Sequence, residues 1–175
     1  MTTEHMRDAA FAANIDDGWP GAVAGYYGGP GEYHQWSPLD WKRFRRNRKL
    51  PIWVAGQGDK NGTVDGRQAV AALRALGVPP HCYTALDMEL MVDKTYVEHF
   101  GEALWDAHYK VWVYGSASTI FSNPPLNGWW VASYAGIGPF MYDHPDVRAT
   151  QYAKGDAYDS SSVKPWTYDD GTWWR

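Results

Sequence analysis

The chain has 175 residues, a formal net charge of −4 at pH 7 and a mean hydropathy of −0.52. This length predicts one domain over residues 1–175, and the net negative charge excludes the broad basic surface that nucleic-acid binding needs. No stretch approaches the roughly 18 consecutive apolar residues of a membrane span, so we expect no membrane partner. The single cysteine, Cys82, excludes an internal disulfide framework and a cysteine-based metal site.

Aromatic residues are unusually frequent for a chain of this hydropathy, with 11 Trp and 12 Tyr. Not all of them fit in a core, so we expect some to be exposed or to line a cleft. Aromatic faces in a cleft suit sugar rings, whereas an individual Trp or Tyr can equally serve as a large core or rim residue.

Short runs rich in Val, Ile, Tyr and Trp alternate with stretches of helical periodicity. This alternation is typical of β/α units around a mainly parallel sheet. The predicted strands are residues 11–15, 22–27, 51–55, 82–86, 110–114, 129–134 and 147–152.

Three helices are predicted between these strands. The first runs through residue 44, with Ser37 as its N-cap and Pro38 in its first turn. The second, residues 63–76, has a clear apolar stripe and ends at Gly77. The third covers residues 95–109.

The tripeptide Asp87-Met88-Glu89 directly follows the predicted strand 82–86. Residues i and i+2 of a strand share a face, so the two carboxyl groups are expected about 6 to 7 Å apart. This is close to the separation at which two acids flank a glycosidic bond with a water between them. The spacing indicates sugar hydrolysis, although a solvated Asp-x-Glu at a strand end is a common alternative.

Polar residues also follow the other predicted strands. In (β/α) barrels the chemistry is carried at the C-terminal ends of the strands, so we expect these side chains to meet on one rim. They are Asp16 and Asp17 after the first strand, Asp87 and Glu89 after the fourth, Tyr114 after the fifth, Tyr134 after the sixth, and Gln151 followed by Asp159 after the seventh.

Several motifs in this order resemble the glycoside hydrolase family 25 lysozymes: Asn14-Ile15-Asp16, Leu86-Asp87-Met88-Glu89, Val-Tyr-Gly-Ser at 113–116, Trp-Trp-Val-Ala-Ser-Tyr at 129–134, and Gln151-Tyr152 before Tyr-Asp-Ser-Ser-Ser-Val at 158–163. The opening at 24–41, Ala-Gly-Tyr-x-x-Gly then Trp-Ser-x-x-Asp-Trp, is closer to the short glycoside-hydrolase-like barrels of actinobacteria and their phages. The resemblance implies an α/β fold, a single TIM-like (β/α) barrel. Because the chain is short for eight full units, we expect a shortened or irregular barrel in which loops replace some helices, as at residues 124–129.

The resemblance also implies site residues. Glu89 matches the family's catalytic acid, Asp87 the carboxylate beside it and Asp159 the aspartate after the last strand. Asp16 matches the strand-one aspartate, with Asp17 as the alternative register. The implied substrate-binding residues are Tyr114, Tyr134, Gln151 and Trp130. Crowding of carboxylates should raise the pKa of at least one of them, and we assign that proton to Glu89.

The implied function is that of a muramidase, which cleaves the β-1,4 bond between N-acetylmuramic acid and N-acetylglucosamine in peptidoglycan. The expected partner is peptidoglycan or a related polysaccharide. The alternative is a catalytically inactive wall-binding or phage virion module on the same barrel, in contact with other virion or cell-wall proteins. A hydrolase of another polysaccharide is a third reading.

No cofactor or metal is expected, because the six histidines show no clustered ligand spacing. The first residues lack the basic start and long apolar core of a secretory signal. We therefore expect a protein that is cytoplasmic at synthesis and acts at the cell wall after lysis or as part of a phage particle.

Overall fold

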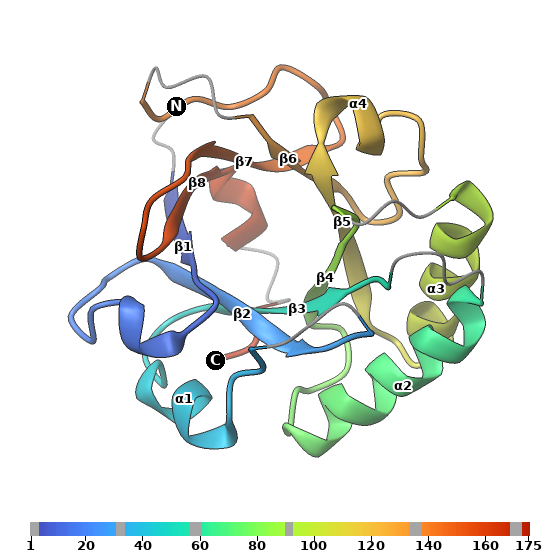
Figure 1. The fold of residues 1–175 in the computed structure, drawn as a ribbon, viewed down its shortest axis with the longest axis horizontal. Helices are drawn as coiled ribbons and strands as arrows, with labels where there is room; N and C mark the ends of the chain where they lie inside the picture. The colour runs from blue at the N-terminus through green and yellow to red at the C-terminus, as the bar shows by residue number, and fades with distance from the viewer. Residues whose placement is uncertain (1–3, 31–33, 57–60, 90–92, 134–137, 169–172) are drawn as a thin grey trace.

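The computed structural model describes residues 4–30, 34–56, 61–89, 93–133, 138–168 and 173–175. Within them, eight strands form one closed barrel in chain order (Figure 1). The strands are β1 (Glu4–Asp8), β2 (Ala22–Gly28), β3 (Lys49–Val54), β4 (Tyr83–Asp87), β5 (Lys110–Ser116), β6 (Trp129–Ala132), β7 (Val147–Ala153) and β8 (Asp159–Val163). The α/β barrel predicted from the sequence is confirmed.

The last strand runs against the others. Neighbouring strands from β1 to β7 are parallel, whereas β8 pairs antiparallel with both β7 and β1. The start of β8 therefore lies at the same rim as the ends of the other strands. Asp159, the first residue of β8, reaches that rim for this reason.

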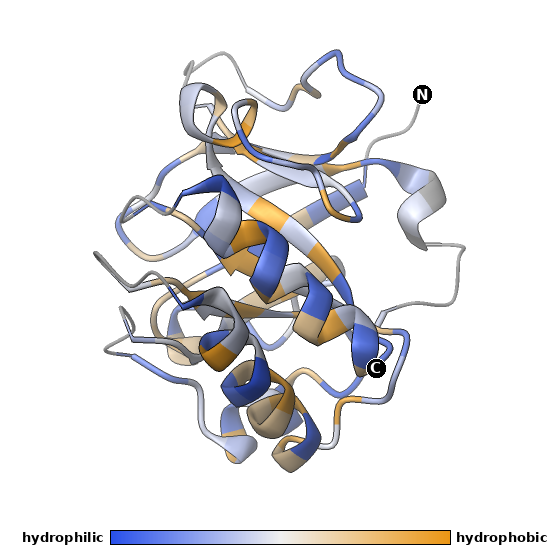
Figure 2. Cartoon of the chain, turned by 90° about the vertical axis from the view of Figure 1, so that its right-hand side faces the viewer, coloured by the Kyte–Doolittle hydropathy of each residue, from blue (hydrophilic) through white to orange (hydrophobic). Residues whose placement is uncertain are grey.

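The helices cover the barrel unevenly. Helices α2 (Gly62–Ala75) and α3 (Lys94–Asp106) lie side by side against one flank (Figures 1 and 2). Elsewhere the connections are short: α1 (Pro38–Arg43), α4 (Ala117–Ile120) and the 3₁₀ turns η1 (Ala12–Asn14) and η2 (Pro165–Tyr168). The predicted loop at 124–129 is confirmed for residues 124–128, since Trp129 already begins β6, and the barrel is irregular as expected.

The three predicted helices and six of the predicted strands are confirmed to within a few residues. The predicted strand at 11–15 is wrong: these residues include η1, and the first strand is β1. β1 has a single large apolar residue, Met6, and β8 reads Asp-Ser-Ser-Ser-Val. Neither strand has the run of apolar residues from which the other strands were predicted. Small and polar side chains occupy most of the positions of β1 and β8.

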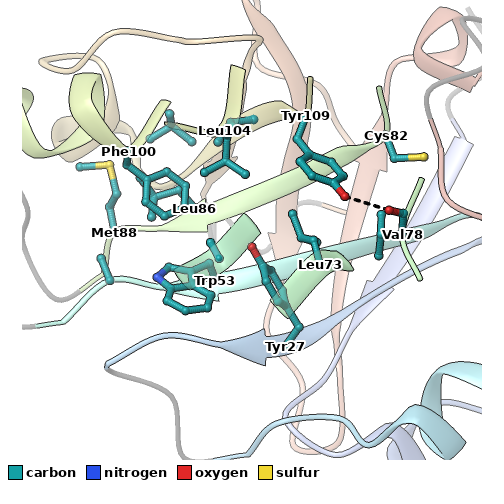
Figure 3. Packing of buried hydrophobic residues seen from close by; sticks show 14 of the residues in the cluster. Tyr27, Trp53, Leu73, Val78, Cys82, Leu86, Met88, Phe100, Leu104 and Tyr109 are labelled. Carbon is teal, nitrogen blue, oxygen red and sulfur yellow. Dashed lines mark hydrogen bonds between the residues drawn. The ribbon is translucent and has the colours of Figure 1, made fainter. Parts of the chain in front are cut away.

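Successive side chains along each strand point alternately into the barrel and outward, so the buried apolar residues form two separate cores. One lies inside the barrel and includes Met6, Ile52 and Trp112. Trp173 packs against Trp112 and Tyr83 and closes the end where β4 and β5 begin. The second core lies between the barrel wall and the helices and includes Tyr27, Trp53, Leu86, Phe100 and Leu104 (Figure 3).

Candidate active site

The alternation that fills the barrel also aims polar side chains at its rim. Met6, Ala24, Ala85, Trp112 and Ala149 are interior residues, and each is followed two positions later by a polar residue on the same face. Those residues are Asp8, Tyr26, Asp87, Tyr114 and Gln151, and the antiparallel β8 adds Asp159.

A cavity of about 360 Å³ opens at this rim. Three of its lining acids are Asp8, Glu89 and Asp159. The remaining lining residues are Ala9, Ala10, Phe11, Asn14, Tyr26, Tyr114, Lys154, Gly155, Asp156, Ala157 and Tyr158.

A larger hollow of about 450 Å³ lies between α2 and α3, away from this rim. Its two acids, Glu102 and Asp106, share the lining with Arg67 and Arg74, so it lacks the concentration of carboxylates found at the rim. We therefore place the candidate active site in the smaller cavity.

Asp8 is the most deeply placed acid of the site, with 5% of its surface exposed. Its Oδ1 atom has no hydrogen-bond partner among the described residues. Burial raises the pKa of Asp8 well above its ordinary value, and the charges of Asp159, Asp87 and Glu89 raise it further. The protonated form of Asp8 is therefore favoured to higher pH than that of an ordinary aspartate.

Asp159 is anchored at both carboxylate oxygens. Its Oδ1 accepts a hydrogen bond from the Gly155 N–H at 3.0 Å, and its Oδ2 accepts one from Nε2 of Gln151 at 2.5 Å. Burial raises the pKa of Asp159, although these hydrogen bonds and the charge of Lys154 act in the opposite direction.

Asp87 and Glu89 occupy different structural settings. Asp87 ends β4 and is 4% exposed, whereas Glu89 lies past the strand end and is exposed. Oδ1 of Asp87 accepts a hydrogen bond from the Glu89 N–H at 2.9 Å, which fixes the turn between them. The hydroxyl of Tyr114 lies 3.3 Å from Oε1 of Glu89.

Gln151 and Trp130 are buried beneath the rim and are not exposed on its surface. Gln151 is completely buried, and its Oε1 accepts a short hydrogen bond from the Tyr114 hydroxyl. Trp130 is 1% exposed, packs against the Tyr114 ring at 4.6 Å and donates to Oγ of Ser161 at 3.0 Å. Both were predicted to bind substrate; in the structure both are buried, Gln151 between Tyr114 and Asp159 and Trp130 against the Tyr114 ring. Tyr134 lies outside the described residues.

Asp16 is not brought to the cavity. It follows η1 on an exposed turn, where its Oδ1 accepts a hydrogen bond from the Gly18 N–H at 2.9 Å. Asp17, the alternative, pairs with Arg43 instead. The acid at the end of the first strand is Asp8. Sequence reasoning missed it because β1 lacks an apolar run, and Met6 two residues earlier was the only signal.

Sequence reasoning also missed three residues on the cavity wall. Phe11, on the connection after β1, is 54% exposed and its ring lies 4.5 Å from that of His34. Tyr26 contributes a second aromatic side chain. Lys154 is the only cation among the cavity's described lining residues.

Within the described residues, no group of three or more His, Cys, Asp or Glu side chains is arranged to hold a metal ion. None of the helices described is both long enough and apolar enough to span a membrane.

No protein-family model and no curated protein matches the sequence. Solved structures do match. An uncharacterized B. stearothermophilus protein shares 18% identity and a TM-score of 0.74, over 95% of this chain and 98% of that one. GHIP, a glycosyl hydrolase 25 of Streptococcus pneumoniae, shares 15% identity and a TM-score of 0.61, over 93% and 88%. The modular Cpl-1 endolysin, solved with a peptidoglycan analogue, shares 15% identity and a TM-score of 0.65, over 92% and 54%. At these identities the likeness shows the fold, which is of the kind found in family 25 lysozymes.

Proposed function

We propose that this protein is a glycoside hydrolase that cleaves peptidoglycan in the manner of a muramidase. The observation that carries the proposal is the convergence of Asp8, Asp87, Glu89 and Asp159 at one barrel rim, around a cavity that three of them line. The fold shared with GHIP and the Cpl-1 endolysin supports the reaction class, and the peptidoglycan analogue bound by the endolysin supports the substrate.

Glu89 is the general acid in this proposal. It is exposed and lines the cavity, so it can reach a glycosidic oxygen, and Tyr114 stands beside its carboxyl group. In glycoside hydrolysis the general acid donates a proton to the leaving oxygen, and this proton transfer typically accelerates the reaction by about 10² to 10⁴-fold.

Asp87 is the carboxylate that stays ionised. The Glu89 N–H stabilises its negative charge, and its position beside the acid suits it to stabilise positive charge at the anomeric carbon or to orient the N-acetyl group. Burial raises the pKa of Asp8, and in its protonated form this side chain can donate a hydrogen bond to a carbonyl or hydroxyl of the sugar.

The walls of the cavity fit a substituted sugar. Phe11 and Tyr26 offer aromatic faces for the apolar side of a pyranose ring. Lys154 offers a positive charge for an acidic substituent, such as the lactyl carboxylate of muramic acid. The other charged residues that line the cavity are acids, which would repel such a group. A volume of about 360 Å³ falls within the usual range for ligand sites.

The test is release of new reducing ends from purified peptidoglycan between pH 4 and 8, comparing wild type with Glu89→Gln. The proposal expects reducing ends from wild type and nearly none from the variant. Tight sedimentation with peptidoglycan, with no reducing ends at any pH, would instead assign the barrel to wall binding. Equal release by both proteins would remove Glu89 from the mechanism.

A further inference from the structure

Basic residues are concentrated in one short segment of this chain. Residues 42–49 read Lys-Arg-Phe-Arg-Arg-Asn-Arg-Lys, with six cations and no acid, in a chain whose net charge is −4. Arg43 pairs with Asp17, and Lys49 is buried with its Nζ 4.7 Å from the centre of the Trp174 ring. The candidate active site uses none of these cations.

A small hollow of about 190 Å³ opens beside this segment. Half of its lining residues are arginines and the others are uncharged: Arg46, Arg48 and Arg175, with Pro20, Gly21 and Ala22. No acid is found among the described residues that line it, whereas in the hollow between α2 and α3 two acids offset two arginines. The small hollow lies at the end of the barrel where β2 and β3 begin, opposite the rim that carries the acids.

The backbone brings two of these arginines together from distant parts of the chain. Lys49 and Trp174 form an antiparallel bridge, in which the Lys49 N–H donates to the Trp174 carbonyl at 2.8 Å. Arg48 precedes Lys49 and Arg175 follows Trp174, so the two arginines leave the bridge on the same side. Like charges placed opposite each other in this way are destabilising. An anion bound in the hollow would offset this repulsion.

Hydrogen bonds from neighbouring groups fix the walls of the hollow. The Asn47 side chain is 7% exposed, and its Nδ2 donates to the carbonyls of Trp19 at 2.8 Å and Gly21 at 2.7 Å. The Val23 N–H donates to the Arg48 carbonyl at 2.9 Å. These bonds join the segment before β3 to the turn before β2, so an anion would bind without having to order the backbone.

The size and the charges of the hollow fit a phosphate group. Arg46 and Arg175 are exposed, and neither forms an ion pair with a described residue. The planar guanidinium fork matches the oxygens of phosphate and carboxylate, and phosphate offers more acceptor oxygens and more charge to several arginines at once. A volume of about 190 Å³ is below the roughly 300 to 1,000 Å³ usual for small-molecule sites, so it suits one phosphate group better than a sugar ring.

We propose that the hollow lined by Arg46, Arg48 and Arg175 binds a phosphate group of an anionic phosphodiester polymer attached to peptidoglycan. The identity of the polymer rests on the proposed function, whereas the phosphate site does not. Because the hollow and the acidic cavity lie at opposite ends of the barrel, the polymer and the glycan strand occupy separate places on the protein. Engaging both would hold the protein on the wall more tightly than either contact alone.

The first experiment titrates the protein with inorganic phosphate and follows the arginine Nε–H signals by NMR. We expect the signals of Arg46 and Arg175 to shift and saturate, while that of Arg67, in the hollow that also contains acids, stays in place. Arg46→Gln combined with Arg175→Gln should weaken phosphate binding by roughly 10-fold or more, and Arg48 is kept because it is half-buried. An equal response to acetate at the same ionic strength, or no saturable shift, would overturn the proposal. Any affinity tag is placed before residue 1, since Arg175 lines the hollow.

The second experiment tests the polymer. Protein carrying Glu89→Gln, chosen to leave the wall uncut, is sedimented with cell walls that bear a phosphodiester polymer and with the same walls after hydrofluoric acid has removed it. Arg46→Gln with Arg175→Gln should reduce retention on intact walls to the level seen on stripped walls, and should change nothing on stripped walls. Lys42→Gln with Arg67→Gln is the matched control, because it removes the same charge from exposed positions outside the hollow and should be retained like the parent.

Equal retention on intact and stripped walls, or equal losses in the two double variants, would overturn the assignment to the polymer. Vesicles containing phosphatidylglycerol form a third arm: retention on them that depends on Arg46 and Arg175, with none on the polymer, would assign the phosphate to a lipid headgroup instead. These measurements do not need turnover. A protein that releases reducing ends but shows no phosphate response loses only the phosphate site, and one that binds phosphate without releasing reducing ends loses only the muramidase proposal.

Discussion

Asp8 and Asp159 are register partners across the antiparallel β1–β8 pair, so two carboxyl groups face the same short stretch of rim. Like charges directly opposite each other on a sheet are destabilising. Burial adds to this repulsion and raises the pKa of both groups, most strongly that of Asp8. A structural role alone does not account for this cost, since an amide or an apolar pair would avoid it.

We expect Asp8→Asn to stabilise the protein at neutral pH. A carboxyl whose pKa is raised in the folded state contributes stability below its ordinary pKa and loses it as the pH rises through the folded value. The wild-type unfolding temperature should therefore fall between mildly acidic and neutral pH, and Asp8→Asn should flatten this dependence. Each unit of raised pKa corresponds to about 1.4 kcal/mol. Calorimetry across pH 4 to 8 measures it, and an unchanged pH dependence would contradict the assignment.

Glu89→Gln should reduce the release of reducing ends from peptidoglycan by roughly 10² to 10⁴-fold, the usual contribution of general acid catalysis. Because Glu89 is exposed, the unfolding temperature of the Glu89→Gln protein should hardly differ from that of wild type. Glu98→Gln is the matched control: Glu98 pairs with Lys94 at 3.5 Å on α3 and is not part of the cavity. Equal losses in the two variants would point to an effect on the fold.

Phe11→Ala should weaken binding to peptidoglycan fragments by about 10-fold, since a stacked aromatic contact is worth roughly 0.5 to 1.5 kcal/mol beyond the area it buries. Phe11→Tyr should keep most of the affinity because it retains the ring. Leu39→Ala removes an apolar side chain that is 72% exposed on α1 and should have no effect. Calorimetric titration with soluble muropeptides provides the comparison, and wild-type affinity in Phe11→Ala would exclude stacking there.

Arg7→Met should loosen the start of β8, where Asp159 lies. The Arg7 guanidinium lies 3.9 Å from the centre of the Trp19 ring and 4.0 Å from that of Tyr158, next to Asp159. Each cation–π contact is worth about 0.5 to 2 kcal/mol, so a loss of about 1 kcal/mol in unfolding free energy is expected. The Gly155 N–H, which bonds to Asp159, should exchange faster with deuterium. Arg67→Met, exposed on α2, is the control, and equal exchange in both variants would count against this role.

Much of the barrel could be predicted from the order of residues. The apolar runs that became β2 to β7 and the capped, amphipathic helices carry their signal locally, because each must bury one face or satisfy its own end. Ser37 illustrates this, since its side chain accepts from the Asp40 N–H in a complete capping box. The acids Asp87 and Glu89 could be found in the same way, because they directly follow a strand with a strong pattern.

The closing strands and the composition of the site depended on tertiary structure. β1 and β8 are strands because the curved wall supplies hydrogen-bond partners on both sides, and no local pattern reports that. Asp8 enters the site only through β1, and Asp159 reaches the rim because β8 runs antiparallel. The amino-acid sequence by itself determined which residues can carry a charge or a proton. The closure of the barrel decided which of these residues share one cavity and which are buried away from water. Burial and the proximity of charges exist only after distant segments of the chain meet.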